Sequence, residues 1–219
     1  RKRFNTHPRI HSRMNYITLL TLFIIGLFFY VLYTIFYGVF REVGFSKREA
    51  GVIVFGSLLG GAVNISLFTY DNWTIAINIG GAVIPILISI YLLAKQRCTW
   101  RILIGLVIVA FFTYNVTWVS SDGVTSPFPL WLIPPLVASI FSLFSCYKRP
   151  KHAAPVAYVS GTLGVLVGAD VFHLPDILAL PASSKVTASI GGAAIFDMVF
   201  LAGIIAVLID AFFISRRHT

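Results

Sequence analysis

The chain has few of the residues from which soluble enzymes build active sites. Its 219 residues include two cysteines and eight acidic side chains. The cysteines, Cys98 and Cys146, form no Cys-x-x-Cys pair, which argues against a disulfide framework or a zinc ribbon. The chain also lacks a P-loop, a dinucleotide-binding fingerprint and a Ser/His/Asp set. We therefore expect no cofactor.

Charged residues are scarce as well, at 11% of the chain, whereas 58% is hydrophobic. A soluble domain of this size has too little interior for that much apolar surface, so most of the chain must face lipid. Because a transmembrane helix needs about 20 mostly apolar residues, we predict an all-α, polytopic transmembrane helix bundle of about seven spans. The predicted spans are residues 16–40, 50–68, 74–94, 102–119, 130–144, 154–172 and 188–214.

The connections between these segments are short and leave no room for a soluble domain. We predict a basic N-terminal tail at residues 1–15, followed by a single transmembrane domain at residues 16–219. The formal net charge of +9 is spread over this tail and the connections, which excludes a nucleic-acid partner and favours contact with the lipid bilayer and its anionic lipids.

The basic residues outside the tail predict the orientation of the bundle. They fall on one side if every segment crosses: Arg41, Lys47, Arg48, Lys95, Arg97, Arg101, Lys148, Arg149, Lys151, Arg216 and Arg217. By the positive-inside rule that side is cytoplasmic. We predict a multi-pass protein of the cell membrane with a cytoplasmic C-terminus. The basic tail would lie on the other side if residues 16–40 span, so the sequence leaves the role of this segment open.

A short motif, Ile-Gly-Gly-Ala, occurs twice, at residues 79–82 and 190–193. Each copy follows a matched stretch of equal length, residues 56–71 and 161–176. We interpret this as a parallel internal repeat of a helical hairpin, at about residues 48–95 and 155–212, related by an axis near the membrane normal. A chance match between two glycine-rich hairpins is the alternative.

The first helix of each predicted hairpin is rich in glycine, with Gly51, Gly56, Gly60 and Gly61 in one copy and Gly161, Gly164 and Gly168 in the other. Small residues let helix backbones approach closely, so packing is one explanation. Interruption of the helices near Asn64 and Pro175, where backbone would face a site, is the other.

Only the second copy carries carboxylates within its apolar segments, Asp170 and Asp197. A charged Asp at the bilayer centre costs at least about 2.5–3.5 kcal/mol, so such a residue should face the bundle interior or water. Two neighbouring carboxylates can share one proton. The alternative is a structural role, in which a protonated Asp forms a hydrogen bond to a neighbouring helix.

The other candidate site residues are Asn64, Asn78, Gly191 and Gly192. We expect the two Asn side chains to donate hydrogen bonds to the acid pair. A third acid, Asp210, is expected near the cytoplasmic interface, paired with Arg216 or Arg217. His173 lies midway between Asp170 and Asp176 at helical spacing, but Pro175 interrupts this set, and we predict no metal site.

Three stretches, residues 78–85, 157–170 and 188–197, resemble a prokaryotic membrane family known only as a domain of unknown function, number sixteen-fourteen. The resemblance covers roughly residues 50–210 and implies no activity. Gly168-Ala169-Asp170 is also similar to the Gly-x-Gly-Asp motif of intramembrane aspartyl proteases. The glycine is shifted, and the nearest Tyr-Asp pair, Tyr70-Asp71, is predicted at an aqueous end.

Three functions fit these features. The first is a small transport or channel-like protein in which Asp170 and Asp197 bind a proton, a cation or a polar solute between the repeats. The second is an intramembrane aspartyl hydrolase with the same two residues as its catalytic acids. The third is a structural subunit in which the acids join helices. The sequence leaves open whether the protein forms an oligomer.

Overall fold

The structure is a computed structural model that describes residues 9–95, 99–120, 123–181 and 185–216, with side chains from residue 16 onward. Its helices are α1 (Arg9–Val43), α2 (Lys47–Gly60), α3 (Ile84–Lys95), α4 (Thr99–Val116), α5 (Ile133–Ser145), α6 (Ala153–Val165), α7 (Leu174–Ala179) and α8 (Met198–Ser215). Its strands are β1 (Asn64–Tyr70), β2 (Trp73–Asn78), β3 (Trp118–Ser120), β4 (Gly123–Thr125) and β5 (Val186–Ile190). The protein is mostly helical, as predicted.

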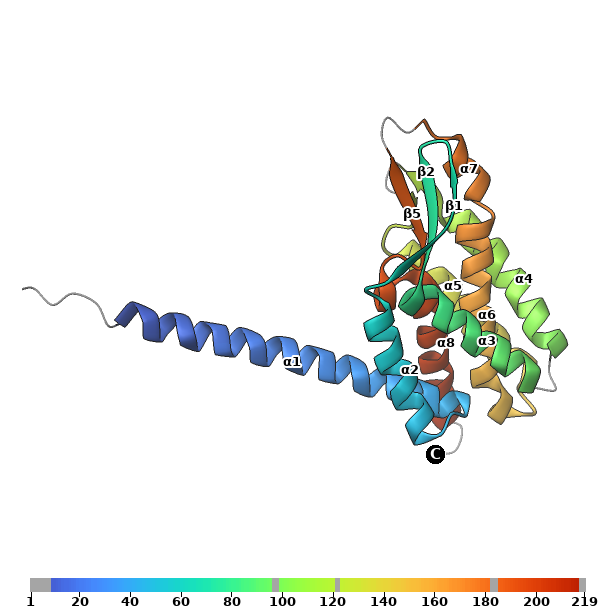
Figure 1. Cartoon of the computed structure of the whole chain (residues 1–219). Coiled ribbons are helices and arrows are strands. Elements are labelled where there is room, and N and C mark those ends of the chain that lie inside the picture. The colour runs from blue at the N-terminus through green and yellow to red at the C-terminus, as the bar shows by residue number, and fades with distance from the viewer. Residues whose placement is uncertain (1–8, 96–98, 121–122, 182–184, 217–219) are drawn as a thin grey trace, which may run out of the picture.

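The helix bundle is built around α6, which packs against α8, α4 and α5 (Figure 1). Almost every residue of α6 is buried, including the ring of Tyr158, which lies against Phe40 of α1. Such a helix, apolar all round, belongs at the centre of a bundle rather than at its surface. The C-terminal part of α1 joins this core through Phe36, Val39 and Phe40.

The number of spans differs from the prediction. Four of the described helical segments are long and apolar enough to cross a membrane: Tyr16–Val43, Thr99–Val116, Pro150–Ala179 and Met198–Ser215. The apolar helices Ile79–Lys95 and Leu130–Ser145 are shorter. The predicted spans at residues 50–68, 74–94 and 188–214 are wrong as continuous helices, because each contains a β-strand. Hydropathy measures apolar length and does not distinguish a short strand from a helix.

The first of these strands begins where α2 ends, at the Gly60-Gly61 pair. β1 and β2 form an antiparallel hairpin with Asp71 in the left-handed region at its turn, and β5 adds to β2 in parallel. The resulting sheet, in the order β1-β2-β5, stands beside α7 at one end of the bundle (Figure 1). Trp73 and Ile75 of β2 pack there against Ile177 of α7 in a second, smaller core.

The parallel pairing of β2 and β5 places the two Gly-Gly segments side by side. A β-carbon at Gly81 would collide with the carbonyl oxygens of Gly191 and Ala194, so the two segments touch through their backbones. Close packing, the role predicted for the glycines of the preceding helices, is thus found at the glycines of the repeated motif itself. The register pairs Ile190 with Ile77 rather than with Ile79 of the repeated motif, and the fold does not show the predicted repeat of whole hairpins.

Of the two explanations for the glycine-rich helices, interruption is seen near Asn64, whereas Pro175 itself lies within α7. α2 gives way to β1, and α6 continues as a π-helical segment, Leu166–Val171, before α7 begins. Gly168 in this segment touches the backbone of Ala110 in α4, which lets the widened turn fit against the neighbouring helix. The interruptions therefore lie at the same end of the bundle as the sheet (Figure 1).

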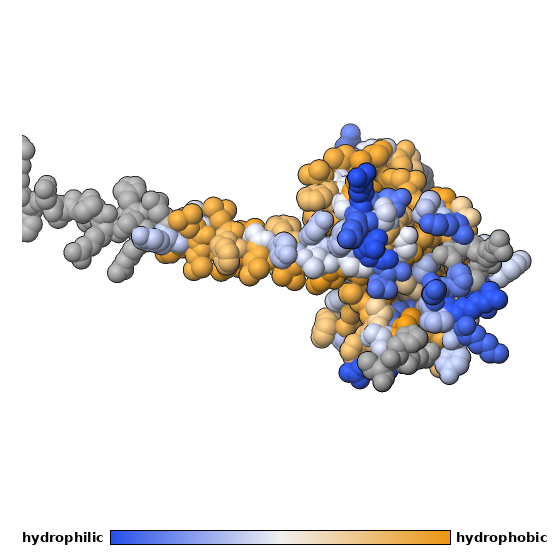
Figure 2. All heavy atoms as spheres, turned by 90° about the horizontal axis from the view of Figure 1, so that it is seen from below, coloured by the Kyte–Doolittle hydropathy of each residue, from blue (hydrophilic) through white to orange (hydrophobic). Residues whose placement is uncertain are grey.

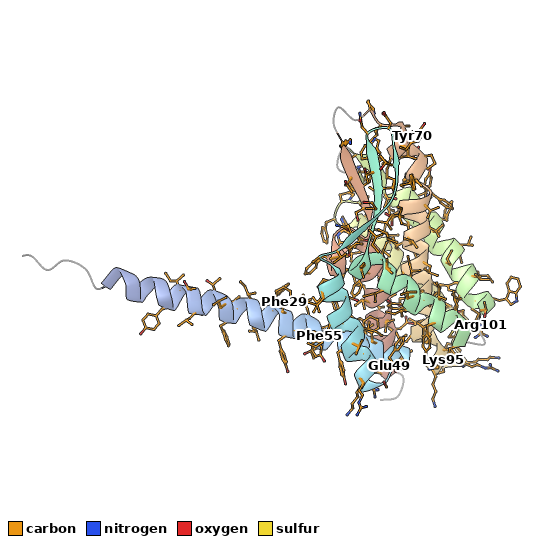
Figure 3. All side chains as sticks on the ribbon, viewed as in Figure 1. Phe29, Glu49, Phe55, Tyr70, Lys95 and Arg101 are labelled. Carbon is orange, nitrogen blue, oxygen red and sulfur yellow. The ribbon has the colours of Figure 1, made fainter. Side chains whose placement is uncertain are left out.

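Charged residues gather at the opposite end. Figure 3 places Glu49, Lys95 and Arg101 there, far from Tyr70 at the tip of the sheet, and Figure 2 shows hydrophilic side chains over that face. Ser46 and Glu49 form a reciprocal capping box at the start of α2. The hydrogen bonds from Ser46 hold the pKa of Glu49 below its ordinary value.

α1 leaves the bundle sideways, and the side chains of its residues 16–31 are all exposed (Figures 1 and 2). The described part of the predicted tail, from Arg9 onward, is helical and continues into the apolar segment. Residues 1–8 lie outside the described residues.

Candidate functional site

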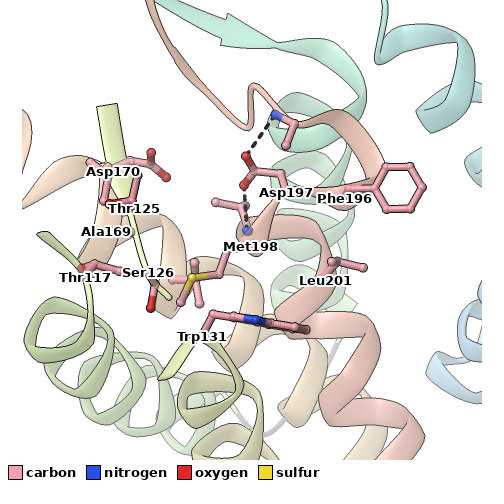
Figure 4. A pocket seen from close by; sticks show the side chains of 14 residues that line it. Thr117, Thr125, Ser126, Trp131, Ala169, Asp170, Phe196, Asp197, Met198 and Leu201 are labelled. Carbon is pink, nitrogen blue, oxygen red and sulfur yellow. Dashed lines mark hydrogen bonds between the residues drawn. The ribbon is translucent and has the colours of Figure 1, made fainter. Parts of the chain in front are cut away.

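Asp197 is the N-cap of α8. One carboxylate oxygen, Oδ1, accepts a hydrogen bond from the N–H of Val199 at 2.9 Å, and Oδ2 accepts one from the N–H of Ala193 at 3.3 Å (Figure 4). The residue was predicted about ten residues inside a span. That position is wrong, because β5 and a 3₁₀ turn, Ala194–Phe196, occupy the preceding residues and α8 begins only at Met198.

Asp170 lies in the π-helical segment that continues α6. Such widened turns are rare and are found frequently at functional sites. Within the described residues, its carboxylate receives no hydrogen bond, and it points across a cavity toward Asp197 (Figure 4). The two acids therefore differ: the Asp197 carboxylate is held by backbone donors, whereas the Asp170 carboxylate is free to take a ligand.

Both acids line the same two neighbouring cavities, of about 340 and 370 Å³. Asp170, Asp197, Val124 and Ala193 belong to both, so the carboxylates stand where the cavities meet. The first cavity lies among the helix ends and is lined by the polar side chains of Thr117, Thr125 and Ser126. The second lies under the sheet. Each has room for several water molecules, since one water occupies about 30 Å³ of liquid.

Of the other predicted site residues, Gly192 lines the second cavity beside the acids, and Gly191 lies behind it against Gly81 and Ala82. Gly191 has a φ of +71°, which an L-residue adopts at a cost. The two glycines thus shape the wall of the cavity through their backbones.

Asn64 and Asn78 do not donate hydrogen bonds to the acids in this structure. The Asn78 side chain is buried. Its amide nitrogen donates hydrogen bonds to the Gly61 carbonyl at 2.9 Å and to Asn64 Oδ1 at 3.0 Å, and its Oδ1 accepts a hydrogen bond from the Gly81 N–H. Asn64 Oδ1 also accepts a hydrogen bond from the hydroxyl of Ser189 at 2.8 Å. The expected contact is wrong because the strands bring these side chains together instead, and they tie β1, β2 and β5 at one end.

Asp210 is buried within the bundle, five residues before the end of α8. Its two carboxylate oxygens accept hydrogen bonds from the hydroxyls of Ser139 at 2.6 Å and Ser142 at 2.5 Å, both on α5. Its expected pairing with Arg216 is wrong, because α8 turns Asp210 toward α5; Arg217 lies outside the described residues. The Ser-x-x-Ser spacing on one face of α5 was the sequence signal for this contact.

His173 is buried and contacts Asp176, with which its spacing grouped it, and Thr117, which the sequence did not connect to it. Its Nε2 lies 3.1 Å from Thr117 Oγ1, and its Nδ1 lies 3.1 Å from Asp176 Oδ2. The ring stacks on Tyr114 of α4, with 4.7 Å between centroids. The residues described contain no group of three His, Cys, Asp or Glu side chains arranged to hold a metal ion.

Comparison with known families gives one match. The model of a family described as a protein of unknown function, DUF1614, matches residues 41–209. The chain belongs to this family. The matched region of this DUF1614 protein contains α2 to α6, the sheet, both acids and most of α8, and leaves out most of α1. No curated protein and no solved structure matches the DUF1614 chain. The resemblance seen in the sequence is thus confirmed for DUF1614, whereas a likeness to aspartyl proteases is not shown.

Proposed function

We propose that this DUF1614 protein is a small membrane transport protein in which Asp170 and Asp197 together bind a proton or a small cation. One observation carries the proposal: two carboxylates from different segments face each other where two cavities meet, in a chain with very few acids (Figure 4). A purely structural role for these acids would place them in a dry helix contact, as Asp210 is placed.

The arrangement explains why a positive ligand is favoured. The N–H donors of Ala193 and Val199 and the N-terminus of α8 stabilise the ionised form of Asp197. A second carboxylate facing the first raises the energy of the doubly ionised pair. A proton on Asp170, or a cation between the two side chains, relieves this repulsion. Exchange of the one for the other would couple cation binding to proton release.

The distribution of charge supports the orientation predicted from the sequence. The described basic residues Lys95, Arg101, Lys148 and Arg149 lie in or beside connections at the end opposite the sheet, and Arg101, Lys148 and Arg149 line a common pocket. We propose that this end, with the C-terminus, is cytoplasmic and contacts anionic headgroups. The sheet and the acid pair would then lie toward the outer side.

Proton release on cation binding tests the proposal. Purified protein in weakly buffered detergent solution receives Na⁺, K⁺ or Mg²⁺ as the chloride salt, and a pH dye records the protons set free. We expect at least one of these cations to release protons from the wild-type protein. Asp170→Asn should abolish the release, because the neutral amide has no proton to exchange.

Asp71→Asn is the matched control, since it makes the same chemical change in the exposed turn between β1 and β2, where Asn also tolerates the left-handed backbone. It should leave the release unchanged. Release that persists in Asp170→Asn, or that disappears in Asp71→Asn, would contradict the proposed site. In proteoliposomes, Asp197→Asn should likewise abolish ion- or pH-driven uptake.

A further inference from the structure

We infer that Asp176, His173 and Thr117 form a proton path that connects water at the sheet end of the molecule with the cavity of Asp170 and Asp197. The inference rests on the proposed function, because the path would supply the proton that Asp170 and Asp197 exchange.

The path is continuous from surface to cavity. The side chain of Asp176 is 58% exposed, whereas that of His173 is 8% exposed. Asp176 Oδ2 lies 3.1 Å from His173 Nδ1, and His173 Nε2 lies 3.1 Å from Thr117 Oγ1. Thr117 lines the first cavity together with both acids. Each contact is within hydrogen-bond reach, so only the step from Thr117 to the acids needs water in the cavity.

The Thr117 hydroxyl can accept a hydrogen bond from the His173 ring or donate one to it. It donates a hydrogen bond to the carbonyl of Thr113 at 2.8 Å, which leaves its oxygen free to accept from His173 Nε2–H. Rotation about the C–O bond turns the same hydroxyl proton away from Thr113, toward cavity water or toward Nε2. Because the Thr117 hydroxyl donates its hydrogen bond to the Thr113 carbonyl, Thr117 is a poor candidate nucleophile, although Thr117, His173 and Asp176 contact one another in that order.

The proton step is balanced at the imidazole. Asp176 takes a proton from bulk water and passes it to Nδ1 of the neutral ring, which carries its own proton on Nε2. The Nε2–H bond of the imidazolium then breaks as its proton moves to Thr117 Oγ1, and the Thr117 hydroxyl proton leaves for cavity water. One proton enters at Nδ1 and one leaves toward the acid pair, and a tautomer exchange of the ring resets the path.

The surroundings of His173 suit this role. Tyr114 of α4 covers one face of the ring with an interplanar angle of 20°, so the two nitrogens stay aimed along the path. Asp176 is a carboxylate at the surface end, and Asp170 lies one turn earlier on the same segment. Among the described residues, the titratable groups that contact the ring or share its segment are these two acids and Tyr114. A ring held between an exposed acid and a cavity hydroxyl can accept at one nitrogen and donate at the other.

The rate of proton exchange at the acid pair tests the path. After a rapid drop in pH, infrared spectroscopy of purified protein follows the C=O stretch of the protonated carboxyl, assigned by its loss in Asp170→Asn. We expect His173→Gln and Thr117→Val each to slow the appearance of this band at least about tenfold, in line with the contribution of positioned proton donors. The final amplitude should stay the same, because the acids are untouched.

Two controls separate a broken path from a damaged fold. Thr117→Ser keeps the hydroxyl and should restore the wild-type rate. His152→Gln makes the same change in a connection next to α6, at the far end, and should have no effect. A wild-type rate in His173→Gln or Thr117→Val would overturn the path while leaving the proposed function intact. A band that does not respond to Asp170→Asn would overturn the proposed function and the path with it.

Discussion

At the residue scale, Asp197 combines a structural role with its proposed functional one. As the N-cap of α8 it satisfies the N–H of Val199, and its second oxygen holds the loop at Ala193. Asn is as good an N-cap as Asp, whereas Ala provides no acceptor. The two substitutions therefore separate capping from charge.

We predict that Asp197→Ala lowers the free energy of unfolding by about 1 kcal/mol and that Asp197→Asn leaves it nearly unchanged. Thermal unfolding in detergent measures both variants. Equal destabilisation by Asn and Ala would show that the carboxylate charge, rather than the cap, supports the start of α8.

Asp210 is a buried acid whose carboxylate is hydrogen-bonded to another helix. Both of its oxygens accept hydrogen bonds from α5, so each serine hydroxyl satisfies one side of a buried carboxylate. Removing a partner leaves a buried polar atom without its hydrogen bond, which costs about 1–3 kcal/mol and more for a charged group.

We predict that Ser139→Ala and Ser142→Ala each destabilise the protein by about 1–3 kcal/mol in thermal unfolding. Ser145→Ala is the control, because within the described residues that hydroxyl bonds to the Ser142 carbonyl and to Cys146 Sγ, both local, and not to Asp210. The prediction fails if the loss in Ser145→Ala is as large.

At the element scale, the contact between the two Gly-Gly segments fixes how the sheet meets the helices. β2 leads into a π-helical turn, Ile79–Val83, and β5 leads into the loop before α8. The turn after β2 and the loop after β5 touch through their backbones. Because Asp197 follows this contact directly, the position of the acid depends on the close approach of the glycines.

We predict that Gly81→Ala greatly reduces the yield of folded protein, since the added methyl would meet backbone oxygens that cannot move aside. Gly38→Ala is the matched control: it lies in helix α1 with open space around it and should be neutral or stabilising by up to about 1 kcal/mol. Size-exclusion chromatography in detergent compares the yields. A normal yield for Gly81→Ala would show that the segments can separate.

At the scale of the whole molecule, α1 is attached to the bundle mainly by its C-terminal part, with a further ring contact between Phe28 and Phe196. Phe36, Val39 and Phe40 are buried, while residues 16–31 are exposed and almost entirely apolar. The family match begins at residue 41, which also leaves most of α1 outside the shared region.

We predict that removing residues 1–26 leaves the thermal midpoint in detergent nearly unchanged, because the described side chains among them, those of residues 16–26, are all exposed. Phe40→Ala, by contrast, should cost about 3–5 kcal/mol as a large-to-small change in a core. Aggregation of the truncated chain, with the full-length chain monodisperse, would mean that the free part of α1 is required for assembly.

Composition by itself determined the class of this protein. An apolar chain with few charges must place most of its surface in lipid and most of its backbone in helices, since only helices satisfy their hydrogen bonds within one segment. The energetic cost of a carboxylate within an apolar segment likewise pointed to Asp170 and Asp197 as candidate site residues from the sequence alone. Local glycine content indicated where the helices would be interrupted.

Only the tertiary structure decided which apolar segments are strands. Residues 64–68 and 74–78 lie at the ends of predicted spans but form β1 and β2, and the pairing of β2 with β5 depends on a partner more than a hundred residues away. The same long-range packing turned Asp210 to the serines of α5, drew Asn78 to Asn64, and set His173 between Thr117 and Asp176. Hydrogen bonds of this kind depend on distance in space, which spacing along the chain does not encode.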